Sequence, residues 1–205
     1  GTDRWIFSRV NRESRAVLEY AGVNVSELRW VLYEFTSIST LEFAWNHMPW
    51  GNIDNGGDVM DQAWFCAEVA GTNKLEFLKW AREVKHCEWN EWTIIEAARK
   101  GNLEILKYCF DNGCPYDEEK ACRYAAIEGH LDCLRFLFDK VKPSRKTEKE
   151  AAIQAARNGH MEILKYFVEE RKISDAVKTV CVAGAANYDQ LDCLKYLVEE
   201  AKVPL

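Results

Sequence analysis

The twelve residues AARKGNLEILKY at positions 97–108 contain the pattern that decides the fold. Their second half, LEILKY (103–108), recurs as an apolar residue, an acid, an apolar residue, leucine, a base and an aromatic residue. The other copies are LEFLKW (75–80), LDCLRF (131–136), MEILKY (161–166) and LDCLKY (191–196). Their starts lie 28, 28, 30 and 30 residues apart, a period typical of a solenoid of stacked units.

Each copy predicts a helix, because its apolar residues recur at helical spacing and form a wide buried stripe. The acid falls in the first turn, where the helix dipole favours it. The acid and the base lie three residues apart and can pair across one turn. An alanine stands five residues before each copy and predicts a column where neighbouring helices approach closely: Ala70, Ala98, Ala126, Ala156 and Ala186.

The residues between each alanine and the following copy predict a tight turn. Three repeats carry Gly101, Gly129 or Gly159 at the same position, and glycine readily adopts the left-handed conformation that ends a helix. The other two repeats carry Asn73 and Asp189, residue types that tolerate a positive φ. All five positions are therefore predicted to have a positive φ.

The segments between repeats predict the end of one helix pair and the start of the next. Gly113 stops a second helix, and Asn90 and Asp117 are N-cap residues for the following first helices. Thr147 with Glu150 predicts a capping box in the next repeat. Each unit is therefore a helix, a tight turn, a second helix and a loop.

This unit resembles the ankyrin repeat in its alanine pair, its Gly-His turn and its Leu-Glu-x-Leu helix. The resemblance covers about 61–205. Within it, the repeats are similar to the divergent ankyrin repeats of algae, oomycetes, amoebae and giant viruses. Trp92-Thr93-Ile94-Ile95 is the nearest trace of the usual Thr-Pro-Leu-His signature, and the short period predicts a short finger between repeats. The predicted fold is all-α, an ankyrin-type solenoid of stacked helix-turn-helix repeats with a helical N-terminal cap. The expected repeats are approximately 61–89, 90–116, 117–146, 147–174 and 175–205.

Residues 1–60 fit the repeat poorly and are predicted to form the cap. Helices are expected at about 4–20 and 26–36, with a degenerate repeat helix over 40–50 and a loop over 52–58. A cap covers the open end of a solenoid, but a docking element is the alternative. Segment 1–20 is faintly similar to F-box-like segments at these residues: Trp5, Val10, Asn11, Arg12 and Arg15.

The N-terminal part also differs from the rest in composition. All eight tryptophans lie within residues 1–92, and no lysine or arginine occurs between Arg29 and Lys74, where six acids do. An acidic, aromatic region of this kind could receive a basic partner. The alternative is structural: Trp45 and Trp80 belong to the core, and Trp50 and Trp89 anchor loops.

Charge and composition argue against several classes of function. A net charge of −6 and a pI of about 5.4 argue against nucleic-acid binding. No apolar run is long enough for membrane insertion, and no signal peptide is visible. We therefore expect an intracellular, reducing location, with the cytoplasm first and an organelle as the alternative.

The eight cysteines are interpreted as small buried hydrophobic residues. Cysteines of one repeat column lie about 10 Å or more apart in stacked helix pairs, too far for a disulfide. No Cys-x-x-Cys pair occurs, so no zinc site is expected. His130 and His160 recur as turn residues, and no nucleophile, base and orienting residue form a recognisable set. No metal, cofactor or enzyme activity is predicted, and a small-molecule ligand is not expected.

One basic stretch near Pro143 could contact phosphate or an acidic partner, although a solvated loop is the favoured interpretation. Acids interleave with its bases, which are Lys140, Lys142, Arg145, Lys146 and Lys149.

The predicted function is a non-catalytic protein–protein interaction module, an adaptor or scaffold. The alternatives are a structural subunit of a larger assembly and the substrate-recognition part of a ubiquitin-ligase adaptor acting through residues 1–20. The two residues after each alanine pair vary while their flanks stay fixed, and the resemblance implies that they line a concave face and contact a partner. Trp89 and Tyr116 at the loop tips are added to this set. The candidate residues are Arg99, Lys100, Ile127, Glu128, Arg157, Asn158, Asn187, Tyr188, Trp89 and Tyr116.

Overall fold

A computed structural model describes residues 35–47, 50–51 and 61–203 of the chain. The helix expected at 4–20, with its F-box-like segment, lies outside the described residues. So does most of the helix expected at 26–36, and residues 35 and 36 are not helical. The loop expected over 52–58 also lies outside them.

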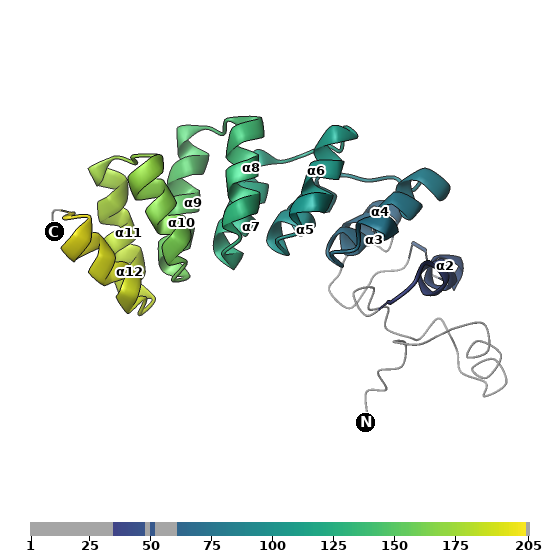
Figure 1. Ribbon diagram of the computed structural model, residues 1–205, viewed down its shortest axis with the longest axis horizontal. Coiled ribbons are helices and arrows are strands. Elements are labelled where there is room, and N and C mark those ends of the chain that lie inside the picture. Colours follow the sequence, from purple (N-terminus) through teal and green to yellow (C-terminus); the bar gives the residue numbers. More distant parts are fainter. Residues whose placement is uncertain (1–34, 48–49, 52–60, 204–205) are drawn as a thin grey trace, which may run out of the picture.

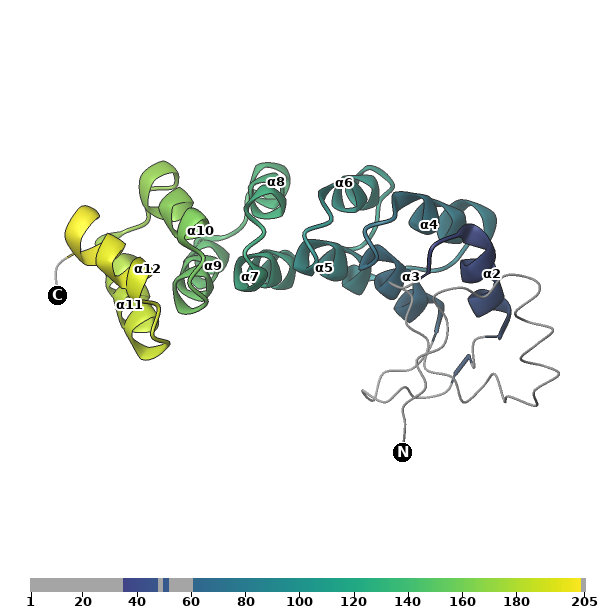
Figure 2. The same cartoon turned by 60° about the horizontal axis from the view of Figure 1, so that its bottom comes forward.

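The described residues form pairs of helices stacked side by side in sequence order (Figure 1). The first helices and the second helices lie in two layers (Figure 2). The part of the chain that the structure describes contains no strand, so the all-α solenoid is confirmed. The first helices are α3 (Gln62–Ala70), α5 (Glu91–Arg99), α7 (Glu118–Glu128), α9 (Arg145–Arg157) and α11 (Asp175–Asn187). The second helices are α4 (Leu75–Lys79), α6 (Leu103–Asp111), α8 (Leu131–Val141), α10 (Met161–Lys165) and α12 (Leu191–Lys195). The helices α4, α10 and α12 continue into the π-helical segments η3 (Trp80–Val84), η4 (Tyr166–Glu170) and η5 (Tyr196–Glu200).

The helix α2 (Ile38–His47) packs on the N-terminal end of the stack. The Trp45 ring meets Phe65 edge to face at a centroid distance of 5.1 Å. Lys74 donates a hydrogen bond from Nζ to the Phe35 carbonyl and so joins the segment before α2 to α4. Trp45 therefore packs against the core, as predicted, and Trp80 is buried.

The alanine column lets the first helices approach closely. Ala70, Ala98, Ala126 and Ala156 are completely buried. First helices contact one another far more extensively than second helices do. Small side chains at the contact permit this short interhelical distance, and the remaining apolar side chains of both layers fill a continuous core.

The predicted turn is confirmed in every repeat. The φ angle is +72° at Gly101, +85° at Gly129 and +76° at Gly159. Asn73 and Asp189 take the same conformation, with φ of +59° and +56°. The left-handed residue thus ends the first helix whether or not it is glycine.

In two repeats the residue after the turn reaches back to the preceding repeat. Asn102 donates from Nδ2 to the Ala70 carbonyl at 2.7 Å, and His160 donates from Nε2 to the Ile127 carbonyl at 2.6 Å. These bonds satisfy carbonyls at the end of the preceding first helix. His160 is therefore a structural residue, as its repeat position predicted, and His130 lies against Gly101 of the preceding repeat.

A second contact joins successive second helices. The base of one repeat lies over the aromatic ring of the next: Lys79 over Tyr108 at 5.8 Å, and Lys165 over Tyr196 at 5.6 Å. Arg135 lies over Tyr166 at 4.6 Å. The base and aromatic residue of the sequence pattern thus act between repeats, while the predicted acid–base pair within a helix forms in α6, where Lys107 lies 2.7 Å from Glu104.

Two of the predicted N-caps are confirmed and one is wrong. Asn90 accepts a hydrogen bond from the Trp92 N–H at 3.0 Å, and Asp117 accepts one from the Lys120 N–H at 3.0 Å. The bond from Lys120 lowers the pKa of Asp117. The predicted capping box of Thr147 fails because α9 begins one turn earlier and is capped by Ser144.

Candidate protein-binding face

Eight of the ten candidate residues lie where predicted, at the C-terminal ends of the first helices. They occupy the last turn of α5, α7, α9 and α11 or the residue just after it. The second member of each pair is exposed: Lys100, Glu128, Asn158 and Tyr188. The first member is half-buried in Arg99, Ile127 and Arg157, and exposed in Asn187. Full exposure of both members was therefore a wrong prediction, because the first member is half-buried in three of the four pairs.

Arg99 is held in place by acids. Its Nε and Nη2 donate to Glu96 Oε1 and Oε2 at 2.9 and 2.6 Å. The carboxylates of Glu96, Glu128 and Glu68 surround it, and the bond to Glu96 is the main cause of its raised pKa. Arg99 is therefore held by an ion pair with an acid of its own helix.

Arg157 is packed across α11. A Cβ atom at Gly184 would lie 3.2 Å from Arg157 Cγ, so the glycine provides the space for the arginine side chain. The guanidinium lies 5.8 Å from the Tyr188 ring centroid. Tyr188 is 58% exposed, so this aromatic ring is fixed by a cation on one side and open to a partner on the other.

The two loop-tip residues lie at the other end of the first helices. Trp89 precedes α5 and Tyr116 precedes α7, so a helix length of about 13 Å separates them from the turn-end residues. Trp89 is half-buried under Arg82, whose guanidinium lies 3.9 Å from its ring, which makes it a loop anchor. Tyr116 is 50% exposed and stacks on Phe110 at 5.1 Å. The ten candidates are thus two separate sets.

Three residues, from the first turns of α5 and α7 and from the middle of α7, also lie on the first-helix side, and the sequence interpretation missed them. Trp92 of α5 is 41% exposed, and Lys120 of α7 lies 5.4 Å from its ring. Tyr124 of α7 is half-buried with Arg123 at 5.2 Å from its ring. Helical spacing could have identified them. Trp92 and Lys120 precede the first pair members by seven residues, which is two turns of a helix and places them on the same helix face. We call the turn-end residues together with Trp92, Lys120 and Tyr124 the first-helix face.

The described residues show no sign of other chemistry. They contain no group of three or more histidines, cysteines or acids that could hold a metal ion. None of their helices has the length and apolarity that spanning a membrane requires. All eight cysteines are buried free thiols, and burial raises the pKa of Cys122 to about 12 and of Cys181 to about 12.

Stacked helix pairs that present variable side chains on a constant frame define a repeat protein. The family model for ankyrin repeats (many copies) matches residues 94–138 and 122–168, from α5 into η4. The chain therefore contains ankyrin repeats over residues 94–168. Ankyrin repeats are generally protein–protein interaction modules and are typically non-catalytic. No curated protein sequence matches the chain.

Proposed function

We propose that this chain is a non-catalytic adaptor or scaffold that binds a protein partner through its first-helix face. One observation carries the proposal: the alanine and turn positions on either side stay nearly constant from repeat to repeat, while the pair between them, whose second member is exposed, changes. Packing explains the constant positions, since the alanines are buried and the turns need a positive φ. Packing does not explain why this exposed position carries a tyrosine in one repeat and a lysine, a glutamate or an asparagine in the others.

The chemistry of the face is mixed rather than uniformly charged. Lys100 and Glu128 carry opposite charges in neighbouring repeats, and Tyr188 and Trp92 supply exposed aromatic surface. Aromatic anchors among paired charges are the side chains that dominate protein interfaces. We expect a folded protein partner that spans several repeats.

The test is capture of partners from the source lysate by wild type and by two matched variants. The first variant is Lys100→Glu/Glu128→Lys/Tyr188→Ala. The control, Lys195→Glu/Glu199→Lys/Val84→Ala, makes the same changes on the second helices, where all three side chains are exposed. A partner retained by the control and lost by the first variant supports the proposal, whereas a partner lost equally from both contradicts it.

A second candidate function, a permanent subunit of a larger assembly, is favoured by the last helix pair. Ala186 and Ala183 of α11 are exposed, as is Leu191 of α12, although the equivalents of Ala186 in the preceding repeats are completely buried. This end therefore has the surface of a repeat-to-repeat junction. If the chain joins the assembly through its last helix pair, Ala186→Glu should leave the isolated chain folded and abolish its incorporation into the assembly. Normal incorporation of this variant would reject the subunit function.

A further inference from the structure

A second surface, distinct from the first-helix face, lies at the loop ends of α7, α8 and α9. The stretch from Asp139 to Glu150 contains five basic and three acidic residues in a chain whose net charge is −6. The structure shows which of these charges are already paired.

The acids of this stretch are largely engaged. Glu148 accepts a hydrogen bond from Arg171 Nε at 2.8 Å, and Glu150 accepts one from Gln154 at 2.7 Å. Asp139 interacts electrostatically with Arg171 of the next repeat. Glu148 is therefore paired with a cation of the next repeat, whereas Glu150 bonds only a neutral amide and keeps its charge near Lys146.

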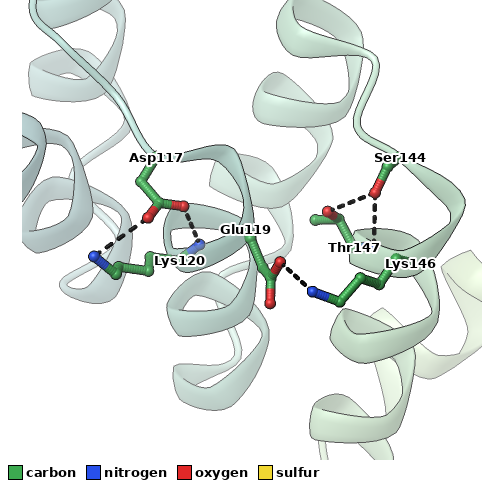
Figure 3. A network of polar contacts seen from close by, with 6 residues as sticks. All are labelled: Asp117, Glu119, Lys120, Ser144, Lys146 and Thr147. Carbon is green, nitrogen blue, oxygen red and sulfur yellow. Dashed lines mark hydrogen bonds and ion pairs between the residues drawn. The ribbon is translucent and has the colours of Figure 1, made fainter.

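The bases divide into two groups. Lys146 of α9 reaches Glu119 of α7 at 2.8 Å and ties the two repeats together (Figure 3). The side chains of Lys142, Arg145 and Lys149 are exposed and have no hydrogen bond or ion pair with any residue that the structure describes. Three unpaired cations thus lie close together in the sequence.

Their position does not serve the stability of α9. Arg145 and Lys146 stand in its first turn, where the helix dipole disfavours a cation. The first turn of α9 also holds an acid, Glu148, as those of α5, α7 and α11 hold Glu91, Glu118 and Asp175, but α9 alone among the described first helices begins with two bases. A role outside the fold accounts for cations at this place.

A chain of ring contacts leads from the exposed Tyr116 to Lys140, which precedes the basic loop. Tyr116 stacks on Phe110 at 5.1 Å, and Phe110 meets Phe136 edge to face at 5.5 Å. Lys140 Nζ lies 5.8 Å from the Phe136 ring, just before the basic loop. Tyr116 is half exposed, so an apolar group of a partner can pack on it while charged groups meet the neighbouring cations.

We infer that Tyr116 with Lys142, Arg145 and Lys149 forms a docking surface for an acidic protein segment that carries an apolar anchor. Carboxylates of the segment pair with the free cations, and the anchor packs on the aromatic cluster of Tyr116, Phe110 and Phe136. A nucleic acid is disfavoured as the occupant, because the acidic chain repels a polyanion and three free cations provide few phosphate contacts.

The test uses a short fluorescein-labelled peptide in which glutamates flank a central Leu-Trp pair. Binding is followed by fluorescence anisotropy at low and physiological salt. Two control peptides replace the glutamates or the Leu-Trp pair with serine. We expect the parent peptide to bind more tightly than both controls, and its affinity to fall with salt.

The matched protein variants are Arg145→Glu/Lys149→Glu and Lys195→Glu/Lys202→Glu. Both change the net charge equally at exposed lysines or arginines, but only the first alters the proposed surface. We expect the first to weaken binding about tenfold or more and the second to leave it within about twofold. Tyr116→Ala should weaken binding of the parent peptide but not of the peptide that lacks Leu-Trp.

Three results would overturn the inference: no binding of the parent peptide, equal losses in the two double variants, or tighter binding of duplex DNA or phosphatidylserine vesicles than of the peptide. The first-helix variant Lys100→Glu/Glu128→Lys/Tyr188→Ala should bind the peptide normally. A failure of this inference is therefore distinguishable from a failure of the proposed function.

Discussion

The substitution Gly129→Ala tests how the turns lock neighbouring repeats together. Gly129 has a φ of +85°, where an L-residue with a Cβ is strained by about 1–2 kcal/mol. A Cβ atom there would also lie 2.6 Å from His160 Nδ1 and 2.7 Å from Cε1. The imidazole must therefore move, although its Nε2 is bonded to the Ile127 carbonyl at 2.6 Å.

The expected cost is the sum of these two effects. Displacing the ring sacrifices a hydrogen bond worth about 1 kcal/mol, so Gly129→Ala should lower the free energy of unfolding by about 2–3 kcal/mol. Gly113→Ala is the matched control: its φ is +72°, and no atom lies within 4 Å of the added Cβ. It should cost only the conformational strain, about 1–2 kcal/mol.

Urea unfolding followed by circular dichroism measures both values. In a His160→Ala background the ring is absent, so Gly129→Ala should cost no more than Gly113→Ala. This double-mutant cycle isolates the contact between the alanine and the ring. Equal costs for Gly129→Ala and Gly113→Ala in the wild-type background would refute the reasoning.

Further expectations concern a cap, the thiols and a helix charge. Asp117→Ala should lower the free energy of unfolding by about 1 kcal/mol near neutral pH. Because the cap lowers the pKa of Asp117, its contribution is present above the ordinary value of 3.8 and is lost as the pH falls below it. The difference from wild type in urea should therefore shrink in acid, and a constant difference would contradict the cap assignment. Because burial raises the pKa of Cys122 to about 12 and of Cys133 to about 11, a chromogenic disulfide should label the native chain slowly at mildly alkaline pH and all eight thiols after unfolding. Rapid labelling of the native chain would show that a cysteine is accessible. Arg145→Glu should raise the free energy of unfolding by about 0.5 kcal/mol, because it replaces a cation in the first turn of α9 with an anion, and a lower urea midpoint would contradict this.

The sequence predicted those parts of the fold that depend on one residue type at one position. Positive φ at Asn73 and Asp189 followed from their alignment with three glycines, and both are confirmed. The π-helical ends of three second helices were not predicted, because a backbone widening of one turn leaves no mark in the apolar period. The cap of α9 was misplaced because Ser144 and Thr147 are both good N-cap residues, and only the structure shows which one bonds.

The candidate site was predictable in position but not in exposure. The repeat alignment placed the variable pairs at the ends of the first helices, where they lie. It could not show that Ile127 is half-buried, or that Arg82 covers Trp89, because burial depends on contacts between residues of different elements. Packing between elements decides such details, and one period of a repeat does not encode it.

The base–aromatic contact between second helices has a consequence for how this molecule can change in length. At three of the four junctions between the described repeats, the earlier repeat provides the cation and the later repeat provides the ring, whereas Lys107 pairs with Glu104 of its own helix. The joint is therefore directional, and a duplicated unit carries both halves of it. A repeat copied in register inherits complementary surfaces on both sides without any further substitution, so the array can gain or lose whole units while every joint stays intact.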